Sequence, residues 1–225
     1  MTNIQFEQDL LDKNIQYIAG VDEVGRGCLA GPMVVAAVIL NAADLCKLAN
    51  NDVTDLETVQ TEEFQKYTQI NDSKLINPNK RSELSKFIQS VSTCYSIEII
   101  EPQLIDKFGI SQVTQIGFYN AIQKLSTKPD YILTDAFKIK KYPEQIQTNI
   151  IKGDRKSISI GAASIIAKVF RDNLMCQLHQ NPIYEPYCFN QHKGYGTKLH
   201  MAMLKKHGPC SIHRRSFDPI KSVLQ

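Results

Sequence analysis

Short apolar runs rich in β-branched residues alternate along the chain with longer segments of helical periodicity. Residues 17–21 and 33–40 are such runs, and glycine-containing turn chemistry between them predicts two antiparallel strands. Three later runs predict further strands at 95–100, 131–134 and 149–152. Apolar residues at helical spacing predict helices over 79–90, 102–125, 159–178 and 198–206. Interleaved strands and helices are typical of an α/β fold with a mixed central sheet flanked by helices.

The segment 41–70 breaks this pattern because it is polar and rich in Asn, Asp, Thr and Gln. We interpret it as a surface insertion with a short helix around 62–67. Residues 176–225 are predicted to form a helical C-terminal part. A length of 225 residues suits one large domain, so residues 1–225 are predicted to be a single domain.

Composition and hydropathy indicate a globular protein of the cytoplasm. Hydrophobic residues make up 43% of the chain and charged residues 22%. The longest uncharged apolar stretch, 28–43, contains Gly31 and Pro32 and is shorter than the roughly 20 apolar residues of a membrane-spanning helix. Residues 1–14 carry three acids and no apolar core of a secretory signal. We therefore expect a cytoplasmic protein with no membrane segment.

The charge balance limits the ways in which the chain can contact nucleic acid. Lys and Arg number 26 against 23 Asp and Glu, a formal charge of +3, so any basic surface must be local. The candidates for contact with a phosphate backbone are Lys193, Lys198, Lys205, Lys206, Arg214 and Arg215.

Six cysteines are too few for a disulfide framework in a chain of this length. Three Cys/His pairs nevertheless resemble zinc-ligand spacing, namely Cys176 with His179, Cys188 with His192, and Cys210 with His213. Their spacings differ and no Cys-x-x-Cys pair is present. The pattern favours small core residues and leaves zinc as an open alternative.

Acidic residues follow several of the predicted strands. Asp22 and Glu23 come directly after the first strand, while Asp135 and Asp154 follow the apolar segments 131–134 and 150–153. Each could simply cap a turn or helix. Carboxylates that converge from separate strand ends also build a site for two hard divalent cations, as phosphodiester hydrolysis requires. Adjacent residues on a regular strand point to opposite faces, so Asp22 and Glu23 can share a site only where the strand ends or distorts.

The segment after these acids has a rival interpretation as a dinucleotide-binding fingerprint. Residues 25–30 match G-x-G-x-x-A, and Asp44 lies at a suitable distance for the ribose. That motif must open a helix whose N-terminus holds the pyrophosphate. Gly31-Pro32 and a β-branched run follow instead, so the context excludes this interpretation.

Seven motifs occur in an order that resembles the ribonuclease HII family, over roughly residues 17 to 220. They are Asp22-Glu23-x-Gly25-Arg26-Gly27, Asn71-Asp72-Ser73-Lys74, Asp135, Lys152-Gly153-Asp154, and the segments 162–172, 192–197 and 213–217. The resemblance implies a ribonuclease H-like fold. It also implies an endonuclease that cuts the RNA strand of RNA/DNA hybrids and nicks duplex DNA 5′ of embedded ribonucleotides, leaving a 3′-hydroxyl and a 5′-phosphate.

The resemblance also implies roles for individual residues. Four match the metal-binding catalytic carboxylates, with Mg²⁺ or Mn²⁺ as the cofactor: Asp22, Glu23, Asp135 and Asp154. Five match substrate-binding positions: Gly25, Arg26 and Gly27 at the ribonucleotide 2′-hydroxyl, Tyr195 on the following deoxyribose, and Lys74 near the backbone. Four further residues fall in motifs that approach the nucleic-acid backbone: Ser164, Lys168, Arg214 and Arg215. The expected partners are the hybrid and ribonucleotide-containing duplex DNA, bound by a monomer.

Two alternatives compete with this hypothesis. Ribonuclease HIII shares the core, but it typically carries an N-terminal substrate-binding domain and lacks the Arg between the two glycines. Only 16 residues precede Tyr17 here, and Arg26 is present. A noncatalytic hybrid-binding module is the second alternative, and the presence of all four acids argues against it.

Overall fold

The computed structural model describes residues 4–50, 61–71 and 73–223. The chain forms two compact units. Unit 1 consists of Met1–Glu23, Val35–Glu98 and Phe118–Val169. Unit 2 consists of Val24–Val34, Ile99–Gly117 and Phe170–Gln225. The single-domain organisation stays a prediction.

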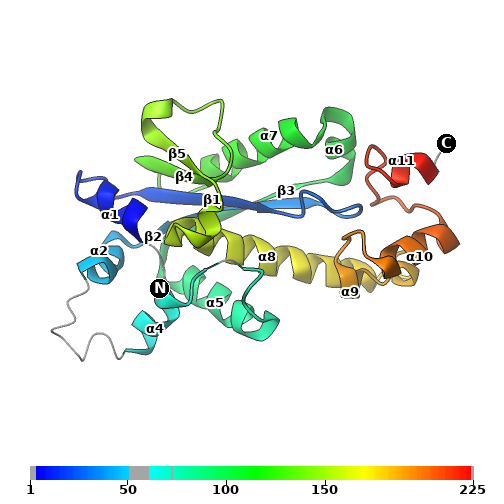
Figure 1. The fold of residues 1–225 in the computed structure, drawn as a ribbon, viewed down its shortest axis with the longest axis horizontal. Helices are drawn as coiled ribbons and strands as arrows, with labels where there is room; N and C mark the ends of the chain where they lie inside the picture. The colour runs from blue at the N-terminus through cyan, green and yellow to red at the C-terminus, as the bar shows by residue number, and fades with distance from the viewer. Residues whose placement is uncertain (1–3, 51–60, 72, 224–225) are drawn as a thin grey trace. The chain divides into compact units, whose positions relative to one another are not determined.

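Five strands form one mixed sheet flanked by helices, in the order β3-β2-β1-β4-β5 (Figure 1). Their bounds are β1 Ile18–Val24, β2 Met33–Leu40, β3 Ser92–Ile100, β4 Tyr131–Asp135 and β5 Gln147–Ile150. Strand β4 runs parallel to both β1 and β5, with Val21 paired to Thr134 and Asp135 paired to Ile150. The predicted fold class is confirmed.

The structure confirms four of the predicted helices, each to within one residue of its expected bounds: those over 62–67, 79–90, 159–178 and 198–206. The helices are α1 Gln5–Leu11, α2 Ala42–Asn50, α4 Glu62–Thr68, α5 Pro78–Val91, α6 Pro102–Phe108, α7 Ile110–Gln123, α8 Ile158–His179, α9 Phe189–His192, α10 Lys198–His207 and α11 Ile220–Val223. Three short 3₁₀ helices are Glu144–Ile146, Gly153–Arg155 and Glu185–Tyr187. Side-chain caps explain where α5 and α10 begin. The side chain of Asn77 accepts a hydrogen bond from the backbone N–H of Lys80, and that of Thr197 accepts one from the backbone N–H of His200. No helix of the described residues is long and apolar enough to span a bilayer.

Three expectations need correction. The helix predicted over 102–125 is two helices, because Gly109 ends α6 with a φ of +78°. Helix α1 lies in a segment for which no helix was expected. The segment 41–70 is more than a surface excursion, because Leu45, Tyr67 and Ile70 are buried. Its residues 51–60 lie outside the described part of the chain.

The core of unit 1 places the start of α8 directly on β1. Leu10, Ile18, Leu133, Ile150 and Ile160 form one buried cluster there. A β-carbon at Gly20 would lie only 2.1 Å from the carbonyl carbon of Ser159. Glycine is therefore required at this point of β1, and it brings the first turn of α8 next to the strand that carries Asp22.

Candidate active site

Two of the predicted acids stand at the same edge of the sheet. The pairing of β1 with β4 ends at Val21 and Thr134, so Asp22 and Asp135 are the next residue on each strand. Because these strands are parallel, their carboxyl ends lie side by side. The side chain of Asp22 is only 5% exposed.

The carboxyl group of Asp22 is held in an environment that opposes its ionisation. Burial and the negative charge of Asp135 raise its pKa to about 7, and Asp154 adds to the increase. A hydrogen bond from Ser164 and one from the backbone N–H of Glu23, at 2.7 Å from Asp22 Oδ1, partly offset these effects. The structure therefore brings Asp22, Asp135 and Asp154 within electrostatic reach of one another, whereas Glu23 acts on Asp22 through its backbone.

A tight turn after β5 positions Asp154. Lys152 adopts the left-handed conformation with a φ of +58°, and Asp154 then lies buried in the 3₁₀ helix Gly153–Arg155. The backbone N–H of Gly153 donates to Asp135 Oδ1 at 2.7 Å. This bond joins the end of β4 to the turn that carries Asp154.

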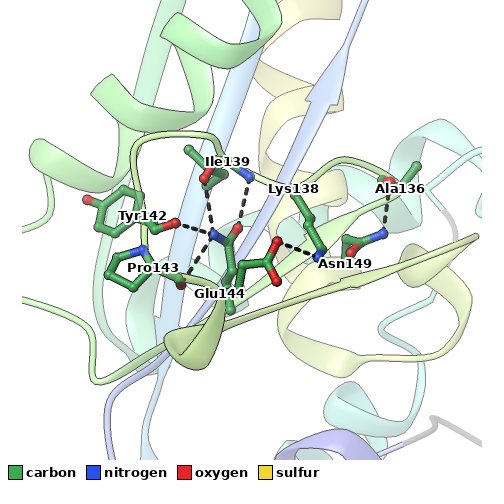
Figure 2. Close-up of polar contacts among 8 residues, drawn as sticks. Ala136, Lys138, Ile139, Tyr142, Pro143, Glu144 and Asn149 are labelled. Atoms are coloured by element: carbon green, nitrogen blue, oxygen red, sulfur yellow. Dashed lines mark hydrogen bonds and ion pairs between the residues drawn. The ribbon is translucent and has the colours of Figure 1, made fainter.

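The loop between Asp135 and β5 is held by Gln147, the first residue of β5. Its amide nitrogen donates to the carbonyls of Ile139 and Tyr142, and its amide oxygen accepts from the backbone N–H of Ile139 (Figure 2). Asn149 also donates to the carbonyl of Ala136, the residue that follows Asp135. These bonds fix the chain on both sides of the loop that Asp135 opens.

Two serine hydroxyls form a hydrogen-bonded connection to Asp22. Ser164, on α8, is hydrogen-bonded at 3.0 Å to the hydroxyl of Ser73, and both residues are buried. The backbone carbonyl of Ser73 accepts from Arg81 Nε at 2.6 Å. Lys74, the next residue, is exposed, and Asp72 of the same motif lies outside the described residues. The motif 71–74 therefore reaches Asp22 through Ser73 and Ser164.

A support that the sequence did not indicate comes from α1. Glu7 is fully buried, and its Oε1 accepts from Ser157 Oγ at 2.5 Å and from the backbone N–H of Ser159 at 3.0 Å. It caps the start of α8, which begins four residues after Asp154. The sequence holds one indication of this cap, an acid three residues before a leucine. The same pattern occurs on any amphipathic helix, so it does not predict the contact.

Among the residues that the structure describes, no three His, Cys, Asp or Glu side chains are arranged to hold a metal ion. The donors at the edge of the sheet nevertheless fit a hard cation. Asp22 and Asp154 are buried carboxylates, and the repulsion that raises the pKa of Asp22 is what a divalent cation would relieve.

The predicted substrate-binding glycines lie in unit 2, where two arginines organise them. Gly25 has a φ of +89° and lies against the Arg171 guanidinium, which also stands 5.7 Å from the centroid of the Tyr195 ring. Arg171 donates to the backbone carbonyls of Ala30, Pro32 and Lys193. Gly25 and Tyr195 therefore both lie next to the guanidinium of Arg171.

Arg214 does not have the role that the sequence predicted, contact with the nucleic-acid backbone. Its side chain is 0% exposed, so it cannot contact a nucleic-acid backbone. It donates at 2.8 Å to the carbonyl of Arg26, and twice to the carbonyl of Gly31, at 2.9 and 3.1 Å. Arg26 is half-buried and Gly27 exposed. The expected phosphate-binding residue is instead the support of the Gly-Arg-Gly segment.

The three Cys/His pairs do not gather into one cluster among the described residues. Cys176 Sγ lies 3.0 Å from Lys193 Nζ, and Cys188 Sγ lies 4.0 Å from the carbonyl oxygen of Pro186. Cys210 contacts His213, its own partner in sequence.

Solved structures with the same fold are ribonucleases, among them a ribonuclease H2 and an RNase HIII. The ribonuclease H2 of Pyrococcus horikoshii OT3 superimposes with a TM-score of 0.68 at 22% identity, covering 92% of this chain and 96% of that chain. Bst-RNase HIII in complex with Mn²⁺ superimposes with a TM-score of 0.59 at 17% identity, covering 93% of this chain and 69% of that one. These likenesses establish the fold.

Sequence comparison identifies the family within this class. The family model for ribonuclease HII matches residues 19–66 and 56–220. The ribonuclease HII proteins of Bacillus cereus (strain AH820) and Bacillus thuringiensis (strain Al Hakam) are each 44% identical over 222 residues, covering 98% of this chain and 76% of theirs. The chain belongs to the ribonuclease HII family and is a nuclease hydrolase, and membership implies cleavage of the RNA strand in RNA/DNA hybrids.

Proposed function

We propose that this nuclease also nicks duplex DNA on the 5′ side of an embedded ribonucleotide, leaving a 3′-hydroxyl and a 5′-phosphate by two-metal-ion hydrolysis. The observation that carries the proposal is the Asp22 carboxyl group, buried beside Asp135 and Asp154 with its pKa raised to about 7. With Glu23 on the same strand, these are the proposed catalytic residues and metal ligands.

Carboxylate oxygens are the ligands that Mg²⁺ and Mn²⁺ prefer in proteins, and Bst-RNase HIII, which has the same fold, was crystallised with Mn²⁺. Two such ions supply an activated water and neutralise the charge that develops on the phosphate. Asp22 holds its place through the hydrogen bonds from Ser164 and Glu23. Asp135 holds its place through the N–H of Gly153.

Recognition of the ribonucleotide is assigned to unit 2 and to Lys74. Gly25 shapes this segment by packing against Arg171, and exposed Gly27 lets its backbone approach the sugar, as discrimination by the 2′-hydroxyl requires. Arg26, whose carbonyl is fixed by Arg214, presents its side chain from the same segment. The Tyr195 ring is assigned to the deoxyribose 3′ of the ribonucleotide, and exposed Lys74 to the phosphate backbone.

The test is cleavage of duplex DNA that contains one ribonucleotide, in the presence of Mg²⁺. Asp135→Asn should abolish detectable cleavage while circular dichroism and hybrid binding stay close to wild type, because a charged ligand is lost without a cavity. Asp12→Asn, an exposed aspartate on the surface of the same unit, is the matched control and should cleave normally. Turnover by Asp135→Asn at the wild-type rate would refute the assignment. Hybrid binding by the wild type without cleavage in either metal would favour the noncatalytic module.

A further inference from the structure

Three buried histidines of unit 2 form a continuous chain that ends at Tyr195. The rings of His192 and His200 stack with their centroids 4.2 Å apart. His200 Nε2 lies 3.0 Å from His213 Nε2. All three side chains are buried. These histidines belong to, or lie between, the Cys/His pairs for which the nuclease reaction gives no role.

The proton on His213 has a defined position. Its Nδ1 faces the backbone N–H of Cys210 at 2.9 Å and the thiol of Cys210 at 3.0 Å. A backbone N–H can only donate, so Nδ1 is an acceptor and the ring proton is on Nε2. Burial raises the pKa of the Cys210 thiol, which keeps the sulfur protonated. His213 therefore donates from Nε2 to His200.

The direction of the hydrogen bond from His213 determines which ring nitrogen of His200 carries the proton. Because its Nε2 accepts from His213, the proton of the neutral ring is on Nδ1, which lies 3.0 Å from the backbone carbonyl of Tyr195. His200 thus donates to Tyr195. Burial lowers the pKa of both His200 and His213 to about 4, in agreement with two neutral rings at pH 7.

His192 fixes the backbone on the N-terminal side of Tyr195. Its Nδ1 accepts from the backbone N–H of Gly194 at 3.1 Å, and its Nε2 donates to the carbonyl of Tyr187 at 2.7 Å. The carbonyl of His192 accepts from the backbone N–H of Tyr195 at 2.9 Å. The Tyr195 carbonyl accepts from Thr197 N–H at 2.8 Å as well as from His200. Both backbone polar groups of Tyr195 are therefore fixed.

We propose that His200, oriented by His213, is a positioning residue that holds Tyr195 for recognition of the RNA-to-DNA junction. It takes no part in the chemistry, because its acceptor and its donor nitrogen are both occupied within the protein. The inference rests on the proposed function, since it assumes that the Tyr195 ring contacts the sugar of the substrate.

The experiment compares two amide substitutions that differ in where they place an N–H. In His200→Asn the amide nitrogen lies near the position of Nδ1 and can donate to Tyr195. In His200→Gln it lies near the position of Nε2 and cannot. The readout is the ratio of kcat/KM on duplex DNA with one ribonucleotide to kcat/KM on a continuous hybrid. This ratio is independent of the fraction of enzyme that is folded.

We expect His200→Gln to lower this ratio about fivefold, the factor that one ordinary intramolecular hydrogen bond is worth. His200→Asn should keep the wild-type ratio, as should the control His207→Asn, an exposed histidine at the end of the same helix. Combining His200→Gln with Tyr195→Ala should lower the ratio no further than Tyr195→Ala alone.

Three outcomes would overturn the inference. If Tyr195→Ala lowers the ratio and His200→Gln does not, His200 does not position Tyr195 and the proposed function stands. If Asn and Gln lower the ratio equally, the imidazole acts only as packing. If Tyr195→Ala leaves the ratio unchanged, the proposed role of Tyr195 fails together with the inference.

Discussion

The guanidinium of Arg171 occupies the space in which a side chain at Gly25 would begin. A β-carbon at Gly25 would lie 2.1 Å from Arg171 Nε, and Gly25 has a φ of +89°. Arg171 is itself fixed by three backbone carbonyls and cannot swing aside without losing those bonds. The backbone at Gly25 and the position of Arg171 therefore depend on each other.

Gly25→Ala should consequently destabilise the protein by about 2–4 kcal/mol, because a strained φ adds to a steric overlap in a packed site. Thermal or urea unfolding measures the loss. Gly27→Ala is the matched control, because a β-carbon at Gly27 would meet nothing within 4 Å. Its stability should stay near wild type even if substrate recognition changes. A Gly25→Ala variant as stable as Gly27→Ala would disprove the steric argument.

The neighbours Arg214 and Arg215 should respond to substitution in opposite ways. Arg214 is buried and makes three hydrogen bonds to backbone carbonyls, so Arg214→Gln should cost about 2–4 kcal/mol of unfolding free energy. Arg215 is exposed, so Arg215→Gln should leave stability unchanged. We expect it instead to weaken hybrid binding and to reduce the dependence of that binding on salt. Equal stabilities for the two variants would contradict the burial of Arg214.

Mg²⁺ should stabilise the protein more at about pH 8 than at about pH 5.5, because it competes with a proton on Asp22. The folded-state pKa of about 7 exceeds the ordinary value of 3.8. Without metal, the stability that Asp22 contributes is therefore present at low pH and is lost as the pH rises through 7. The measurement is the difference in Tm with and without Mg²⁺ at each pH. Asp22→Asn should remove the pH dependence of that difference, and equal differences in the wild type would argue against the site.

Leu45→Ala should reveal that the segment 41–70 belongs to the folded core. Leu45 is buried on α2, so truncation should cost about 2–5 kcal/mol. Cys46→Ala, at the exposed next position of the same helix, should have little effect. A Leu45→Ala variant of wild-type stability would restore the interpretation of the whole segment as a surface insertion.

Hydrophobic periodicity predicted the sheet and α8 because those elements bury their apolar residues in regular patterns. It failed at Gly109, where one glycine with positive φ divides a continuous helical pattern into α6 and α7. It also failed for 41–70, because a polar average concealed the few buried side chains, Leu45, Tyr67 and Ile70.

At the candidate site, strand-end acids could be recognised from sequence, but their supports could not. Arg214 illustrates the difficulty, since an arginine in a basic motif has the same sequence signal whether it faces phosphate or backbone carbonyls. Its partners, Arg26 and Gly31, lie far from it along the chain. The same holds for Glu7 and Ser157, a contact that only the folded chain brings about.

The order of the strands also has a consequence for synthesis of the protein. Ile18 pairs with Tyr131, and the acidic edge requires Asp154 beyond β5. A contact of such sequence separation must wait for a large loop to close, which slows folding. In a ribosome-bound chain from which Asp154 has not emerged, Asp22 still lacks one of the two acids that raise its pKa. The proposed catalytic site can therefore be complete only after Asp154 has left the ribosome.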